Sequence, residues 1–178
     1  MPQCRNIVLC GFMGSGKTTV GRVLAGRTGL PFVDMDEYIE EKAGMTVSEI
    51  FNRYGEGHFR DLEHEAAKEL GKRDGCIISA GGGTLVYPRN VEVLRESCRI
   101  VLLDAPLAVM KRRLKNDKKR PLLQRPDKDE AMQELYTLRM PLYRAAAHLT
   151  VNAAQSPYKT AREIAKAFAL TARAKNHK

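Results

Sequence analysis

The sequence predicts a single α/β domain in which helices cover both faces of a parallel β-sheet. Five short apolar runs recur along the chain, and helix-like segments separate them, as expected for such a sheet. The runs occupy residues 7–10, 32–33, 76–80, 100–103 and 149–151. With 178 residues and 43% apolar composition, the chain can bury one self-sufficient core and leaves little room for another. We therefore treat residues 1–178 as one domain.

The segments after the first two runs carry signals for helices. Val20, Val23 and Leu24 have helical spacing behind the first run. Further on, Thr46 and Glu49 form a capping box, which predicts that a helix begins there. The apolar face of a helix is then marked by Phe59, Leu62, Ala66 and Leu70.

Two further helices are predicted from N-cap residues that stand ahead of a proline. Asp104 precedes Pro106, and Ser156 precedes Pro157, so each pair favours the start of a helix. The side chains expected to face the sheet from these helices are Val109, Met110, Ile164 and Phe168.

A glycine-rich loop, residues 11–18, joins the first run to the first helix. Its sequence GFMGSGKT matches the phosphate-binding pattern G-x-x-x-x-G-K-[ST], here called the P-loop. The glycines let backbone N–H groups turn toward phosphates, Lys17 can reach the β and γ oxygens, and the Thr18 hydroxyl can ligate Mg²⁺. We expect ATP to be held by Gly14, Ser15, Gly16, Lys17, Thr18 and Thr19.

Two carboxylates, Asp34 and Asp36, follow the second apolar run. At the carboxyl edge of a parallel sheet, one can hold hydrated Mg²⁺ while the other accepts from an attacking hydroxyl. The alternative is that they cap the next helix, where Asp is favoured.

Several other residues suggest a binding site for an acceptor. Arg60 and Glu63 share one helix face, although a surface ion pair would also explain them. Consecutive glycines at 81–83 suit a close approach of backbone to a ligand, with a plain loop as the alternative. Arg139 stands late in a helix.

The formal net charge of +9 attracts anions, among them nucleic acid. Eight basic residues and one acidic residue lie at positions 111–125. Because no aromatic residue for base stacking stands among them, this cluster favours a triphosphate, and we expect no nucleic-acid partner. Residues 116–129 are polar and contain two prolines, which predicts a mobile loop that is functional or disordered.

Other features indicate a cytoplasmic protein. No run approaches the roughly 20 apolar residues that a membrane-spanning helix needs, and residues 1–6 have no signal-peptide core. The cysteines lack metal-site spacing and are expected to be reduced and mostly buried: Cys4, Cys10, Cys76 and Cys98.

Together these motifs resemble the shikimate kinase family over about residues 5–170. The segments GFMGSGKTTVGRVLA, DMD, FRDLE, GGG, KKRPLL and RMPLY stand in the family's order and at its spacing. The resemblance implies a P-loop NTPase of the nucleoside-monophosphate-kinase type, a three-layer fold with a five-stranded parallel sheet and a lid near residues 116–129. It also implies transfer of the ATP γ-phosphate to the 3-hydroxyl of shikimate, within aromatic amino-acid biosynthesis, by a monomer that uses Mg²⁺.

The same resemblance implies which residues bind the acceptor. Asp36, Arg60, Gly82 and Arg139 would contact shikimate, a carboxylate with three hydroxyls. Two guanidinium groups can fix the acid, while Asp36 accepts from hydroxyls and the Gly82 amide donates. Glu63 would orient Arg60.

The resemblance also implies that Lys17, Asp36 and Arg120 are the catalytic residues of the phosphate transfer. Arg120 would close over the phosphates, and Arg113 would stack on adenine, although neighbouring basic residues compete for that role. Mg²⁺ would be bound by Thr18 directly and by Asp34 through water.

Three alternatives remain open at this point. A small sugar-acid kinase such as a gluconate kinase shares the nucleotide half, although its acceptor residues differ from those found here. A basic P-loop protein that binds nucleic acid would need stacking aromatic residues. A catalytically inactive binding module would lack catalytic residue types, and all of them are present.

Overall fold

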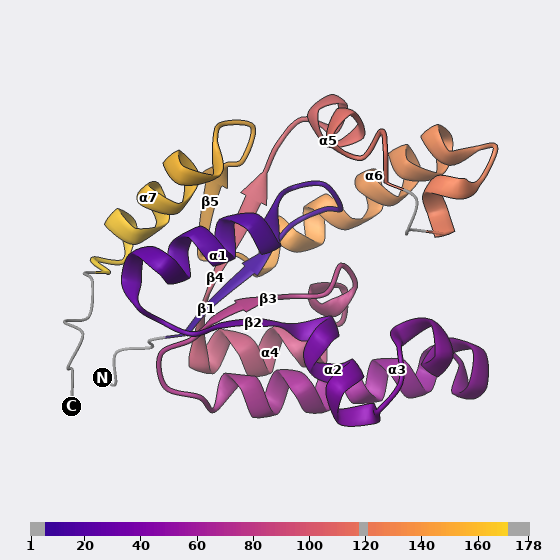
Figure 1. Cartoon of the computed structure of the whole chain (residues 1–178), viewed down its shortest axis with the longest axis horizontal. Coiled ribbons are helices and arrows are strands. Elements are labelled where there is room, and N and C mark those ends of the chain that lie inside the picture. The colour runs from indigo at the N-terminus through magenta and orange to yellow at the C-terminus, as the bar shows by residue number, and fades with distance from the viewer. Residues whose placement is uncertain (1–5, 118–120, 171–178) are drawn as a thin grey trace.

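A computed structural model describes residues 6–117 and 121–170. Five strands form one parallel sheet in the order β2-β3-β1-β4-β5 (Figure 1). The strands are β1 Asn6–Cys10, β2 Phe32–Asp34, β3 Ile77–Ser79, β4 Cys98–Asp104 and β5 Leu149–Asn152. Each coincides with one of the five predicted apolar runs, so the sheet prediction is confirmed.

β1 lies in the middle of the sheet, between β3 and β4. Val8 is paired with Ile78 on one side and with Ile100 on the other, and all three side chains are fully buried. From β1 the chain passes to the β2 and β3 side, and it crosses only later to β4 and β5. The carboxyl end of β1 is therefore a topological switch point, the usual place of a ligand in such sheets.

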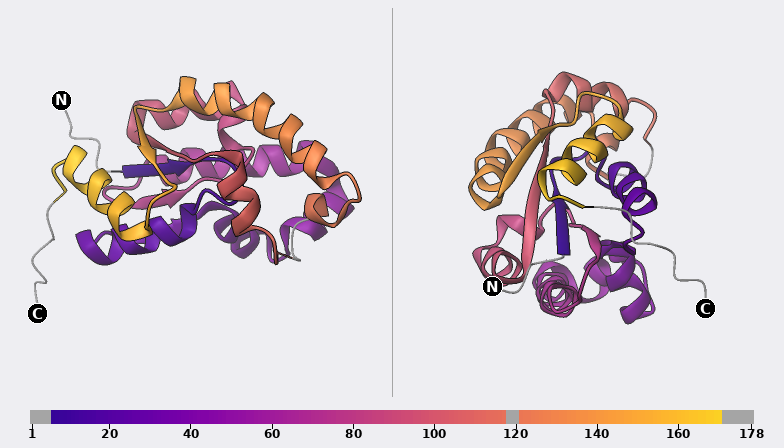
Figure 2. Two further views of the ribbon diagram at one scale, coloured as in Figure 1. Left: turned by 90° about the horizontal axis from the view of Figure 1, so that it is seen from above. Right: turned by 90° about the vertical axis from the view of Figure 1, so that its left-hand side faces the viewer.

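Helices cover both faces of the sheet and complete three layers. α1 and α7 lie side by side on one face, and α4 and α6 cover the other (Figure 2). α2 and α3 lie beside the edge formed by β2 and β3 (Figure 1). The α-helices are α1 Lys17–Thr28, α2 Met35–Ala43, α3 Val47–Gly71, α4 Pro88–Ser97, α5 Leu107–Arg113, α6 Lys128–Ala146 and α7 Pro157–Ala167. Two short 3₁₀ helices are η1 Thr84–Val86 and η2 Pro121–Gln124.

Two of the three predicted helix starts are confirmed. Thr46 and Glu49 form the capping box of α3, and the Ser156 hydroxyl accepts from the Lys159 N–H at the start of α7. The prediction for Asp104 was wrong, because this residue ends β4 and its carboxylate pairs with Arg144 at 3.2 Å. The N-cap of α5 is instead Pro106, which has no hydroxyl or carboxylate to offer.

The segment predicted as a mobile loop, residues 116–129, contains helical structure where it is described. It holds η2 and the beginning of α6, and Leu123 is buried while Leu122 packs against the core. Two leucines of this polar segment therefore pack against the core, and its predicted mobility stays a prediction. Arg120 lies outside the described residues.

The cysteine prediction holds for three of the four residues. Cys10, Cys76 and Cys98 are buried, and Cys4 lies outside the described residues. Burial raises the pKa of the Cys10 thiol to about 12, so it stays protonated and unreactive at neutral pH. Across residues 6–117 and 121–170, no helix is long and apolar enough to cross a membrane.

Candidate functional site

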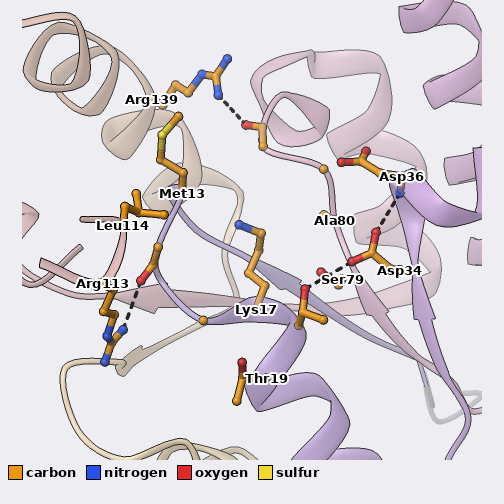
Figure 3. Close-up of a pocket in the computed structure, with 15 residues that line it drawn as sticks. Met13, Lys17, Thr19, Asp34, Asp36, Ser79, Ala80, Arg113, Leu114 and Arg139 are labelled. Carbon is orange, nitrogen blue, oxygen red and sulfur yellow. Dashed lines mark hydrogen bonds between the residues drawn. The ribbon is translucent and has the colours of Figure 1, made fainter. Parts of the chain in front are cut away.

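A cavity of about 420 Å³ opens at the carboxyl ends of β1, β2 and β3 (Figure 3). Its lining includes residues of the P-loop, Asp34 and Asp36, residues 79–82, and the guanidinium-bearing residues Arg113 and Arg139. The cavity therefore brings together groups that lie far apart in the sequence, at the predicted edge of the sheet.

The P-loop has the backbone shape of a phosphate cradle. Gly14 and Gly16 have φ values of 79° and 93°, which L side chains rarely adopt. A Cβ on Gly14 would also lie only 3.0 Å from the Met110 carbonyl oxygen. α1 begins at Lys17 with no side-chain cap, so its first N–H groups and its positive dipole end remain available to an anion.

Ser15 supplies a second sign that a ligand is expected in the P-loop. Its hydroxyl is fully buried, and it is the one buried side-chain N or O atom without a hydrogen-bond partner in the described chain. Buried hydroxyls nearly always have partners. A phosphate oxygen in the cradle would satisfy it.

Lys17 extends from the first turn of α1 toward the middle of the cavity (Figure 3). Its ammonium donates to the Gly11 carbonyl at 2.8 Å, across the P-loop. The charge is thus held above the cradle, where phosphate oxygens would lie.

Asp34 accepts hydrogen bonds at both of its carboxylate oxygens. One carboxylate oxygen accepts from the N–H groups of Asp36 and Glu37, at 3.1 and 3.4 Å, and caps α2. The other oxygen accepts from the Thr18 hydroxyl at 3.4 Å. These hard oxygen donors, Thr18 and Asp34, suit Mg²⁺. The described ranges contain no group of three or more His, Cys, Asp or Glu residues that could hold a metal ion.

Asp36 does not cap α2 and instead lines the cavity. Burial raises its pKa to about 6, and the charges of Asp34 and Glu63 contribute in the same direction, while Lys17 opposes them. A carboxylate with a raised pKa is a stronger acceptor for a hydroxyl proton near neutral pH.

The raised pKa of Asp36 predicts that the free energy of unfolding depends on pH. The folded chain binds the Asp36 proton more tightly than the unfolded chain, so this contribution is fully present below the unfolded pKa of 3.8 and is lost as pH rises through about 6. Asp36→Asn is therefore expected to raise the free energy of unfolding at about pH 8 by roughly 2 kcal/mol, with a smaller gain at about pH 5. Urea unfolding at both pH values measures this difference. Asp61→Asn, a change in an exposed ion pair, is the control. If Asp36→Asn changed the free energy of unfolding equally at both pH values, the raised pKa of Asp36 would be contradicted.

The glycine triplet, residues 81–83, allows side chains to approach from three directions. A Cβ on Gly81 would lie 2.8 Å from Asp36 Oδ1, and one on Gly83 would lie 2.9 Å from Arg60 Cζ. Neither position tolerates a side chain without displacing a charged group. The glycines are therefore needed for the close approach of protein side chains, and the predicted approach of a ligand stays a prediction.

Arg139 and Tyr143 hold the Gly82 peptide from α6. Arg139 Nη1 donates to the Gly82 carbonyl at 3.2 Å, and the Tyr143 hydroxyl donates to the same oxygen. Burial raises the pKa of Tyr143 to about 12, so the hydroxyl remains a donor. Sequence reasoning missed Tyr143, although its place four residues after Arg139 puts both on one helix face.

Arg60 lies behind the glycine triplet and is not part of the cavity lining. Its Nη1 pairs with Glu63 Oε2 at 3.0 Å, and its Nε and Nη2 donate to Glu56 at 3.2 and 3.0 Å. Because Glu63 is only 1% exposed, the surface-ion-pair alternative is wrong for the Arg60–Glu63 pair. Burial disfavours the charged guanidinium, but the two carboxylates outweigh that effect and raise the Arg60 pKa.

Arg113 joins the P-loop to the loop after β5. Its Nη1 donates to the Gly14 and Ser15 carbonyls at 3.2 and 3.4 Å, and its Nη2 donates to the Ala153 carbonyl at 2.6 Å. The guanidinium thus lies at the cavity wall on the P-loop side (Figure 3). Of the predicted site residues in the described ranges, two are absent from the lining: Arg60, and Ser15, which is buried within the P-loop.

Comparisons with known proteins show which families the chain is similar to. The family model described as shikimate kinase matches residues 13–169. A shikimate kinase of Geobacter sulfurreducens is 48% identical over 150 residues, which are 84% of this chain and 82% of the relative. The solved shikimate kinase of Acinetobacter baumannii, in complex with shikimate, has a TM-score of 0.86 and 38% identity over 93% of both chains. A gluconokinase of Sinorhizobium meliloti, with a TM-score of 0.61 and 22% identity over 95% of this chain and 94% of its own, shares the fold.

Proposed function

The chain belongs to the shikimate kinase family, and we propose that it transfers the γ-phosphate of ATP to the 3-hydroxyl of shikimate. One observation supports this most strongly: Lys17 and Asp36 line the same cavity, with the P-loop on one side and residues 79–82 and Arg139 on the other. A phosphate donor and a polyhydroxy acid can therefore meet within a single cavity.

In this proposal the P-loop binds the ATP phosphates. Backbone N–H groups at the start of α1 and the Ser15 hydroxyl donate to phosphate oxygens, while Lys17 exchanges its bond to Gly11 for the β and γ oxygens. Positively charged donors held at this place stabilise charge that spreads over the γ-phosphoryl oxygens during transfer. Thr19, also in the lining, adds a hydroxyl at the same end of α1.

Thr18 and Asp34 are proposed to hold Mg²⁺, Thr18 directly and Asp34 through water. Their oxygens lie 3.4 Å apart, beside the P-loop, and both are of the type that Mg²⁺ prefers. When bound, the ion would neutralise part of the negative charge of the phosphates. Arg113 at the cavity wall is proposed to lie against adenine, and Arg120 is proposed to approach the phosphates from the lid.

Shikimate is proposed to occupy the Asp36 side of the cavity. Asp36 accepts hydrogen bonds from the shikimate hydroxyls. Because the pKa of Asp36 is raised, its carboxylate can accept the proton of the attacking hydroxyl. Arg139 and the Gly82 N–H bind the shikimate carboxylate at the part of the cavity wall where they lie together. Arg60 adds its Nε and Nη2 edge, where the substrate carboxylate replaces the exposed Glu56.

A gluconate kinase is the nearest alternative, because the fold and the nucleotide half are shared. At 22% identity, the gluconokinase comparison speaks for the fold alone. The acceptor half of this chain instead combines the glycine triplet, the Arg60–Glu63 pair, and Arg139 with Tyr143 on α6. This combination favours shikimate as the acceptor.

A coupled assay of ADP release distinguishes these acceptors directly. Wild-type protein is tested with ATP and Mg²⁺ against shikimate, quinate, gluconate and nucleoside monophosphates. We expect rapid ADP release with shikimate and little with the others, and ³¹P NMR identifies the phosphorylated position. Equal turnover of gluconate, or ADP release without any acceptor, would reject the proposed function. The proposal includes a monomer in the cytoplasm, which size-exclusion chromatography and cell fractionation test.

A further inference from the structure

The Glu63 carboxylate is fixed at both of its oxygens. Oε2 pairs with Arg60 Nη1 at 3.0 Å, and Oε1 accepts from the Thr84 hydroxyl at 2.7 Å. Both Glu63 and Thr84 are almost completely buried. The orientation of the carboxylate, and with it the place of Arg60, therefore depends on a donor in η1 as well as on Arg60 itself.

The Thr84 backbone is held by a hydrogen bond from Asn90 of α4, and Asn90 is held in turn by α3. Its carbonyl accepts from Asn90 Nδ2 of α4 at 2.9 Å, and Asn90 Oδ1 lies 2.8 Å from His64 Nδ1 of α3. Its own N–H donates to the Gly81 carbonyl at 3.1 Å. The hydroxyl thus comes from a backbone that neighbouring elements fix, which is what a positioning group requires.

Loss of that hydroxyl would leave Glu63 with one unsatisfied oxygen close to another carboxylate. The Cβ position of Gly81 lies 3.1 Å from Glu63 Oε1 and 2.8 Å from Asp36 Oδ1, so both carboxylates border the same small space. A buried acceptor without a donor is costly, and two facing carboxylates repel each other. Glu63 would turn away, and Arg60 would lose the partner that orders its long side chain.

We infer that Thr84 is a positioning residue for acceptor binding: its hydroxyl orients Glu63, which in turn holds Arg60 ready for the carboxylate of the acceptor. This inference rests on the proposed function, because the acceptor used in the test is shikimate. Thr84 has no direct role in nucleotide binding, since it lies behind the glycine triplet and outside the cavity lining.

Thr84→Val removes the hydroxyl and keeps the side-chain shape. We expect the shikimate KM to rise about tenfold, while kcat and the ATP KM stay within about twofold of wild type, because ground-state acceptor binding is lost. Thr84→Ser restores the donor and is expected to recover most of the affinity. Calorimetry with shikimate alone, without ATP, should show the same order of Kd values.

Thr28→Val is the matched control, since Thr28 is a buried threonine whose hydroxyl donates to the Leu24 carbonyl at 2.8 Å at the end of α1. Its shikimate KM should stay at the wild-type value.

If Thr84→Val does not fold, Thr84→Ala is compared with Thr84→Ser, because these two differ only in the hydroxyl. A wild-type shikimate KM in the hydroxyl-free variant, or no recovery with Ser, overturns the inference. Absence of shikimate turnover in the wild-type protein would instead count against the proposed function.

Discussion

Replacement of Lys17 by alanine is expected to lower kcat by about a thousandfold or more, because it removes the positive charge held above the phosphate cradle. The ammonium lies against the Gly11 carbonyl, so it can move to the β and γ oxygens without a change in the backbone. Its charge is most valuable when negative charge spreads over the γ-phosphoryl group. The loss should therefore appear in kcat, with a smaller rise in the ATP KM.

The fold should survive this change. Lys17 is only partly buried, and its bond to Gly11 is one of several that shape the P-loop. Thermal unfolding and the coupled ADP assay together separate lost catalysis from lost folding. Lys68→Ala, at an exposed position of α3, is the control and should keep wild-type turnover. Turnover of Lys17→Ala within about tenfold of wild type would contradict the phosphoryl-transfer role.

The fold could be predicted from the sequence because the central strands are buried on both faces. β1 and β3 are apolar almost throughout and end in loops of glycine and polar residues, a pattern typical of a parallel sheet. Asp104 was assigned wrongly as an N-cap, because a residue type that favours the start of a helix can equally well end a strand. Gly55, with φ 81° and ψ 173°, interrupts α3 at a point that helical periodicity alone does not reveal.

The nucleotide half of the site was predictable, because the P-loop is local in sequence. The acceptor half is not local, and its distances depend on how α2, α3, η1 and α6 meet around the glycine triplet. Thr84 illustrates this point: nothing in its sequence neighbourhood signals that its hydroxyl lies 2.7 Å from Glu63, 21 residues away. The structure of α2 was likewise needed to show that Asp34 caps the helix and lines the cavity, whereas Asp36 lines the cavity without capping.

Arg60→Lys is expected to raise the shikimate KM by about a hundredfold, the second large effect. In the structure Arg60 uses three nitrogens at once, with Nη1 on Glu63 and with Nε and Nη2 on Glu56. A lysine ammonium cannot keep the buried bond to Glu63 and also present a planar, two-pronged edge to a substrate carboxylate. It would also lose the stacking of the guanidinium against Phe59 and Tyr87, whose ring centres lie 5.2 and 5.0 Å away.

The ATP KM should change little in Arg60→Lys, because the side chains that Arg60 contacts belong to α3 and to the segment after the glycine triplet, and none belongs to the P-loop. Steady-state kinetics with each substrate varied in turn measure this separation, and calorimetry with shikimate alone gives the binding term directly. Arg22→Lys is the control, since Arg22 makes an exposed pair with Glu37 and lies over the Phe32 ring. A common rise in both KM values would indicate damage to the whole site. An unchanged shikimate KM in a folded variant would mean that the Arg60–Glu63 pair only stabilises α3, and that Arg139 alone binds the substrate carboxylate.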